Sequence, residues 1–64
     1  MTRIRRGGYL FMTWAGDHPP KHVHVYLDGE LVLKWDLQKW RPVFGLPGSR
    51  LMRLLAELRA EGRL

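Results

Sequence analysis

Three stretches of the chain have the apolar pattern of β-strands. Residues 9–14 form an aromatic-rich run without helical spacing, and residues 22–26 alternate as His-Val-His-Val-Tyr, a period of two. Residues 31–37 form a third apolar run, separated from the second by Asp28-Gly29, a common hairpin turn. The pattern predicts an antiparallel three-stranded meander, which becomes four-stranded if residues 43–44, Val-Phe, add a short edge strand.

After a loop rich in proline and glycine, apolar residues return with helical spacing. The i, i+3, i+4, i+7 positions of an amphipathic helix are occupied by Leu51, Leu54, Leu55 and Leu58. Ser49 can cap the start of this helix and Gly62 can end it, which predicts a helix over residues 49–62. We therefore expect an α+β fold, with one C-terminal helix packed on one face of the antiparallel sheet.

The register of the predicted hairpin decides which face of the sheet holds the histidines. A two-residue loop at Asp28-Gly29 would mix the histidines with the apolar residues of the returning strand. A three-residue loop, residues 27–29, pairs Tyr26 with Glu30 and separates the two kinds of residue, so burial of apolar side chains favours it. Gly29 then takes the left-handed position of a bulge. The apolar face holds Val23, Val25, Leu31, Leu33 and Trp35, and the other face holds His22, His24, Tyr26, Val32, Lys34 and Asp36. We expect the helix to cover the apolar face through Leu54, Leu55 and Leu58, which leaves the histidines accessible.

The chain has 64 residues and no cysteine. That length suits a single domain, in which we expect residues 1–7 to form a mobile basic arm, residues 8–48 the sheet and its loops, and residues 49–62 the helix. Domains below about 70–80 residues usually need extra stabilisation, and without cysteine a disulfide is excluded. Because a small sheet leaves its edges uncovered, we expect a homodimer or a hetero-complex.

Hydropathy also bears on location. No apolar run approaches the roughly 18 residues of a membrane span, and no apolar stretch typical of a secretory signal follows the basic start of the chain. The absence of cysteine fits a reducing compartment. We therefore expect a cytoplasmic protein without a membrane partner.

Basic residues outnumber acidic ones and concentrate at the two ends of the chain. Eleven Lys and Arg against six Asp and Glu give a net charge of +5. Such a balance suits RNA or an acidic protein partner, and it also serves solubility alone. Trp40 lies between two basic residues in a loop, so we expect it to be exposed and able to stack on a base or fill a partner's pocket. The candidate contact residues are Arg3, Arg5, Arg6, Lys21, Lys39, Trp40 and Arg41.

Two histidines on one strand are the clearest candidates for chemistry. His22 and His24 are two residues apart, so their imidazoles project from one face with Cα atoms about 6–7 Å apart. The pair can bind a divalent metal with His18 or Asp17 as third ligand, as in a histidine metal-binding domain. Alternatively, one histidine takes a proton from a ribose 2′-hydroxyl and the other protonates the leaving oxygen, a ribonuclease-like reaction without metal or cofactor. The catalytic candidates are then His22, His24, Lys34 and Asp36. A purely structural alternative, in which the histidines hydrogen-bond across the sheet, stays open.

The same stretch carries a resemblance to a known family. Residues 17–25 read D-H-P-P-K-H-V-H-V, and a hairpin, an acidic residue near its end and a leucine-rich C-terminal helix follow. This arrangement resembles a family of small bacterial proteins catalogued as a domain of unknown function with a D-H-x-P-x-H-V-H-V-type signature. Its members are similar to components of toxin–antitoxin gene pairs. The resemblance implies a nucleic-acid-directed component of such a module, with the neighbouring gene product as a partner. A protein-interaction module that binds an acidic partner is the alternative.

Overall fold

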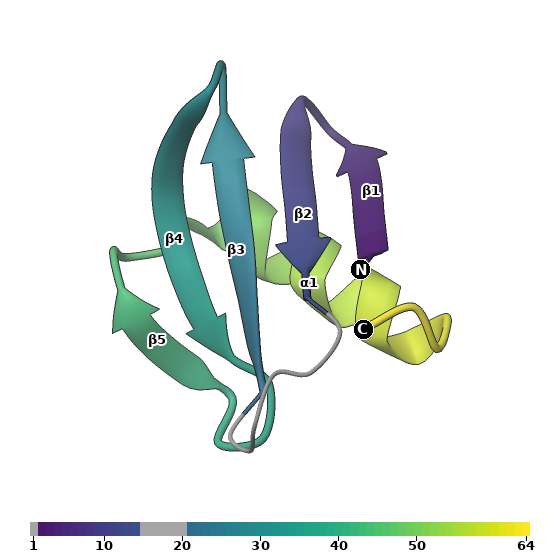
Figure 1. Ribbon diagram of the computed structural model, residues 1–64. Coiled ribbons are helices and arrows are strands. Elements are labelled where there is room, and N and C mark those ends of the chain that lie inside the picture. The colour runs from purple at the N-terminus through teal and green to yellow at the C-terminus, as the bar shows by residue number, and fades with distance from the viewer. Residues whose placement is uncertain (1, 15–20) are drawn as a thin grey trace.

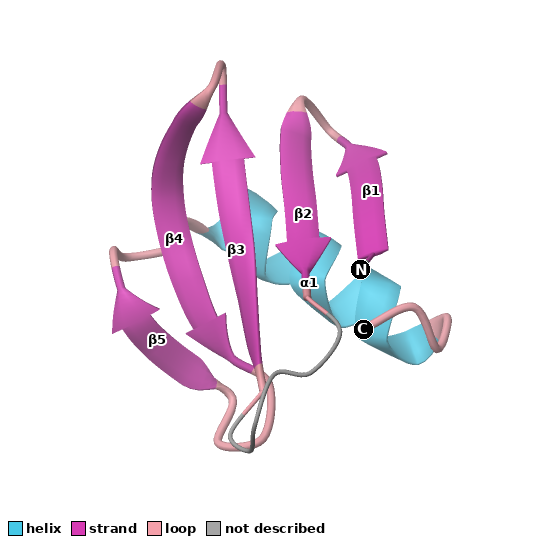
Figure 2. Cartoon of the chain, viewed as in Figure 1, coloured by secondary structure: helices cyan, strands magenta, loops and turns pink. Residues whose placement is uncertain are grey.

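The computed structural model describes residues 2–14 and 21–64, which form one antiparallel sheet and one helix. Their elements are β1 (Thr2–Arg6), β2 (Tyr9–Thr13), β3 (His22–Leu27), β4 (Glu30–Asp36), β5 (Arg41–Phe44) and α1 (Ser49–Ala60). The strands lie side by side in chain order, and α1 lies across one face of the sheet (Figures 1 and 2). The α+β class, the antiparallel meander and the C-terminal helix are confirmed, but the sheet has five strands in place of three or four.

The additional strand comes from the N-terminal segment, which we expected to be a mobile arm. Residues 2–6 pair with β2 from Thr2↔Thr13 to Arg6↔Tyr9, and Ile4 opposite Phe11 is only 3% exposed. The connecting turn uses Gly7 and Gly8, both with positive φ, a conformation that glycine adopts without strain. One buried isoleucine among arginines therefore anchors an edge strand where composition alone indicates a charged tail.

The β3–β4 hairpin differs from the expected register, and a bulge explains why the faces are still separated. The loop has two residues, Asp28 and Gly29, both with positive φ as in a type I′ turn, so the three-residue loop was wrong. The register then shifts between Val25 and Tyr26, which leaves Val32 as an extra residue in β4. In consequence Val32 packs against the core, and Leu31 lies opposite Tyr26 on the other face.

The hydrophobic core lies between the sheet and α1. It consists of Ile4, Phe11, Val23, Val25, Leu33 and Trp35 from the strands and Leu51, Leu55 and Leu58 from the helix. The helix therefore packs on the valine face, as expected, although Leu54 is only half-buried at the margin of the cluster. None of the helices in the described ranges is long and apolar enough to cross a membrane.

The ends of α1 follow local chain chemistry. The residue before the first turn is Gly48, with no side-chain hydrogen bond, so Ser49 is the first helical residue and not a cap. At the other end Gly62 has a φ of 75°, and its N–H and that of Arg63 donate to the carbonyls of Arg59 and Leu58. This pair of hydrogen bonds is the Schellman motif, and it confirms that the helix ends at Gly62.

Candidate functional site

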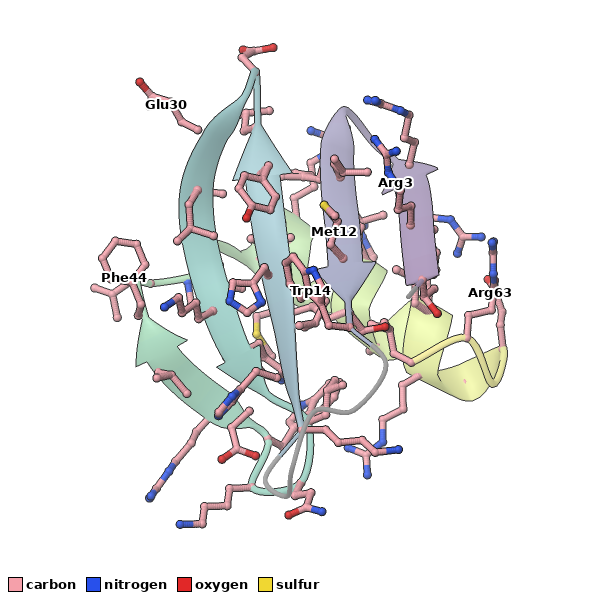
Figure 3. The ribbon with its side chains drawn as sticks, viewed as in Figure 1. Arg3, Met12, Trp14, Glu30, Phe44 and Arg63 are labelled. Atoms are coloured by element: carbon pink, nitrogen blue, oxygen red, sulfur yellow. The ribbon has the colours of Figure 1, made fainter. Side chains whose placement is uncertain are left out.

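The face of the sheet turned away from α1 carries aromatic, apolar and basic side chains. In β1 to β4 these residues alternate with those of the core, so they project to the opposite side. We call this surface the open face, and its residues are Arg3, Arg5, Leu10, Met12, Trp14, His22, His24, Tyr26, Leu31, Lys34, Asp36, Arg41 and Phe44. Met12 and Trp14 stand in front of the sheet in Figure 3, on the side opposite α1.

Strand pairing arranges the open face in rows. One row runs across four strands as Arg5, Leu10, Tyr26 and Leu31, and the next runs across five as Arg3, Met12, His24, Lys34 and Phe44. A third row, at the end of the sheet, holds His22, Asp36 and Arg41. Directly opposed residues of antiparallel strands have Cβ atoms about 4.5–5.5 Å apart, so neighbours in a row touch. The first two rows begin with arginine at β1 and cross apolar and aromatic side chains, and the basic residues of β4 and β5, Lys34 and Arg41, lie in the second and third rows.

Trp14 is the largest aromatic side chain exposed on this face. Its ring lies edge-on to His24, with 4.5 Å between ring centroids and an interplanar angle of 84°. Trp14 keeps 38% of its surface exposed, and Phe44 in the neighbouring row keeps 52%. An aromatic ring that is partly exposed and held against a second ring is suited to stacking on a planar ligand.

His22 and His24 lie where the sequence places them, on the face away from the helix. Both are half-buried, and the register sets His22 opposite Asp36 and His24 opposite Lys34. The four catalytic candidates are thus neighbours on two paired strands. The remaining proposed metal ligands, Asp17 and His18, lie outside the described residues. Within the described ranges, no group of three or more residues of ligating type is close enough together to hold a metal ion.

Asp36 has a local structural task. The residue is only 4% exposed, and its Oδ1 accepts hydrogen bonds from the backbone N–H groups of Gln38 and Lys39, both at 2.9 Å. These bonds, that from Lys39 first, lower the pKa of Asp36, and the nearby charges of His22 and Lys39 act in the same direction against the effect of burial. The carboxylate therefore stays ionised and holds the turn between β4 and β5, in contact with the histidine strand.

The predicted contact residues fall into two groups. Arg3, Arg5 and Arg41 are exposed on the open face, and Lys21 and Lys39 are exposed beside it, at the ends of β3 and β4. Arg6 is different, because it lies on the helix side of β1. Its guanidinium donates to both carboxylate oxygens of Glu61, at 2.7 and 2.9 Å, which raises the pKa of Arg6 and lowers that of Glu61.

Trp40 also departs from expectation. It is half-buried, in contact edge-on with the core residue Trp35 at 5.4 Å between ring centroids. The guanidinium of Arg59 on α1 lies 4.5 Å from the centroid of the Trp40 ring. The loop position of Trp40 indicated exposure, but its positive φ of 55° turns the ring back toward the helix. Trp40 is therefore part of the packing between β4 and α1.

Other residues of the open face were missing from the sequence-based candidates. The sequence predicted Leu10, Met12, Trp14 and Phe44 only as strand residues, and Tyr26 only as a residue of the face that holds the histidines. Their alternation with Phe11 and Val25 was the available signal, since in a one-helix sheet the face away from the helix has no cover. Near the hairpin turns this face is hollowed by a pocket of about 300 Å³, lined by Arg5, Gly8, Leu10, Met12, Tyr26, Asp28 and Gly29.

Comparisons of the chain with protein-family models, with curated proteins and with solved structures found no match. The resemblance of residues 17–25 to the D-H-x-P-x-H-V-H-V family therefore stays a prediction.

Proposed function

We propose that the open face binds single-stranded RNA. The observation that carries the proposal is a sheet face without a helix over it, on which exposed aromatic rings lie between arginines at one edge and basic residues at the other. Bases stack on aromatic side chains without regard to sequence, and Lys and Arg contact the phosphates between them. Trp14, Tyr26 and Phe44 provide the rings. Arg3, Arg5, Lys34 and Arg41 provide the charge.

Three arginines on the helix side already have partners within the chain. On the helix side, Arg6 is bonded to Glu61, while the guanidiniums of Arg50 and Arg59 lie against the rings of Tyr9 and Trp40. Arg3 and Arg5 form no ion pair with any described residue, so their charge is available to a ligand. An acidic protein would satisfy these charges, but it gives no reason for aromatic rings in the same rows.

Binding is measured by fluorescence anisotropy of a labelled single-stranded RNA, with a duplex of the same sequence beside it. Four phosphate contacts predict that log Kd rises with log salt with a slope of about 3. The double variant Arg3→Gln/Arg5→Gln is expected to bind more weakly and to reduce this slope by about 1.4. Arg53→Gln/Arg63→Gln, which removes the same charge from the helix side, is the matched control and is expected to have a smaller effect. If the two double variants lose equal RNA affinity, binding depends on net charge alone, which would contradict the proposal.

A role in a toxin–antitoxin-like pair follows from the resemblance together with this surface. We propose that induced expression of the chain arrests growth and that the product of a neighbouring gene relieves the arrest. Arg3→Gln/Arg5→Gln is expected to lose the arrest at an unchanged protein level. Arrest that persists in this variant would separate the cellular effect from the open face.

RNA cleavage is the second candidate, because His22 and His24 share the open face and Lys34 lies opposite one of them. One imidazole would take the proton of a ribose 2′-hydroxyl while its oxygen attacks phosphorus, and the other would protonate the departing 5′ oxygen, leaving a 2′,3′-cyclic phosphate. The test is incubation of RNA with the protein in a chelator, followed by gel analysis. Cleavage that His22→Gln/His24→Gln abolishes, with anisotropy binding retained, would support this reaction. Intact RNA with the unaltered protein would limit the function to binding.

A further inference from the structure

Apolar side chains are exposed together at one edge of the sheet. Val43 is 56% exposed, Phe44 52% and Leu46 90%, and they come from β5 and the residues directly after it. Phe44 projects at the outer border of the sheet in Figure 3. Single exposed apolar residues are ordinary, whereas three within four positions at an uncovered edge of a sheet favour an interaction surface. We call these three residues the β5 edge patch.

Within the described part of the chain, the backbone of β5 also has no partner strand on one side. β5 is the last strand of the sheet and pairs only with β4, so the backbone groups on its outer side face solvent, although Pro42 has no N–H to contribute. The opposite edge, β1, carries Arg3, Arg5 and Arg6, and charge of this kind deters pairing with another strand. Residues 42–48 contain no charged side chain. The β5 edge, whose strand carries Arg41 as its one charged side chain, is therefore the less charged of the two edges.

The β5 edge patch is held in place by the close approach of two strands. Gly45 has a φ of 82°, and a Cβ atom built there would collide with the carbonyl oxygen of Val32, the bulged residue of β4. Only glycine fits this position, and it directs the chain so that Leu46 stands 90% exposed. A backbone held by such a contact loses little conformational entropy on association.

We infer that two copies of the chain associate through β5, with their β5 strands antiparallel. An apolar patch with its own edge strand is complementary to itself about a two-fold axis. The net charge of +5 opposes contact between copies everywhere except at an uncharged surface, which residues 42–48 supply. Association also buries apolar area that a single domain of 64 residues leaves exposed.

The geometry of the pairing has a consequence for the open face. Antiparallel pairing of identical strands in one sheet sets the two-fold axis perpendicular to the sheet. Both helices then lie on one side, and both open faces lie on the other as one continuous surface. The dimer does not depend on the RNA-binding proposal, because its test measures the mass of the protein without RNA.

Sedimentation equilibrium of the unaltered chain tests the inference, with variants that place a charge in the patch. We expect a mass near twice the 7.5 kDa of one chain at tens of micromolar, falling toward one chain on dilution. Val43→Lys and Leu46→Lys are each expected to be monomeric, with circular dichroism like that of the unaltered chain because both sites are exposed. The matched control is Leu27→Lys, at another exposed leucine, 37% accessible and on the far hairpin turn; it should still dimerise.

Amide hydrogen exchange is the second measurement. Amides of residues 43–46 are expected to exchange more slowly at high protein concentration than at low, and this difference is expected to vanish in Val43→Lys. A monomer at every concentration would overturn the inference and leave the patch to a different protein. A dimer that survives both lysine substitutions, or one that Leu27→Lys also dissociates, would overturn the assignment to β5.

Discussion

The two faces of the sheet are made from the same strands but have different tasks. In β3, Val23 and Val25 are fully buried under α1, while the intervening His22, His24 and Tyr26 are half-buried and face away from it. The helix-covered face contains the whole core cluster, and the open face contains Arg3 and Arg5, which form no ion pair with a described residue, and the exposed Trp14. Stability therefore resides on one face and the proposed recognition on the other, so substitutions can separate them.

The same comparison holds for charge. Arg5 and Arg6 are adjacent in β1, yet Arg6 is bonded to Glu61 of the helical segment while Arg5 lines the pocket of the open face. Neighbouring residues of a strand point to opposite faces, so a single step in sequence converts a structural ion pair into a candidate ligand contact.

Truncation on the covered face should have the largest effect. Leu58 is fully buried between α1 and the sheet, and Leu58→Ala is expected to lower the free energy of unfolding by about 2–5 kcal/mol. Urea denaturation followed by circular dichroism measures the loss. Leu10→Ala on the open face is the matched control and is expected to cost less, because Leu10 is only half-buried. Equal costs would mean that both faces contribute equally to the core.

The junction of β4 and β5 should respond next. Gly45→Ala introduces a left-handed alanine, which costs about 1–3 kcal/mol, and adds a collision with Val32. Gly29→Ala is the control, since its φ of 82° imposes a similar strain but no atom lies within 4 Å of the added Cβ. Thermal unfolding is expected to place Gly45→Ala below Gly29→Ala. If the two variants unfold alike, the contact between β5 and the bulge does not constrain the chain.

On the open face, removal of Trp14 should affect binding and leave folding nearly unchanged. Trp14→Leu is expected to weaken RNA binding by about 1–3 kcal/mol, the value of one base stacked on an aromatic ring. Trp14→Phe keeps a ring and should retain much of the affinity. Anisotropy titrations of the three proteins, with unfolding curves beside them, make the comparison. If Trp14→Leu binds RNA as tightly as Trp14→Phe does, stacking at this position is excluded.

Acidification should have the smallest effect. The pKa values of Asp36 and Glu61 are lowered in the folded chain, so each carboxylate stabilises the fold above its unfolded pKa, about 3.9 for Asp and 4.3 for Glu. This stability is lost as the pH falls through the lower, folded-state pKa. The melting temperature should therefore decrease when the pH is lowered below about 4.

Asp36→Asn removes one of these groups and is expected to flatten the acid limb of the melting profile. Its melting temperature at neutral pH should also fall, because an amide oxygen accepts the N–H groups of Gln38 and Lys39 more weakly than a carboxylate does. An acid limb identical to that of the unaltered chain would contradict the assigned role of Asp36.

Much of the architecture follows from local pattern alone. The period of two in residues 22–26 placed the valines in the core and the histidines opposite, and the spacing of Leu51, Leu55 and Leu58 produced the helix face that covers them. Gly62 ended the helix through its own backbone freedom. Each of these signals acts between residues a few positions apart, so it can be read along the chain.

The remaining features depend on contacts between distant segments. Ile4 becomes part of a strand because Phe11 and the helix bury it, and Arg6 pairs with a glutamate 55 residues away. Val32 is displaced into a bulge, and Trp40 turns toward Trp35 and Arg59 instead of solvent. By itself, the sequence determined the elements, the core stripe and the face of the histidines, because periodicity and turn chemistry are local. The tertiary structure alone decided the five-strand sheet, the bulge, and which arginines and aromatic rings remain free to meet a ligand, because burial by distant segments selects among locally equivalent conformations.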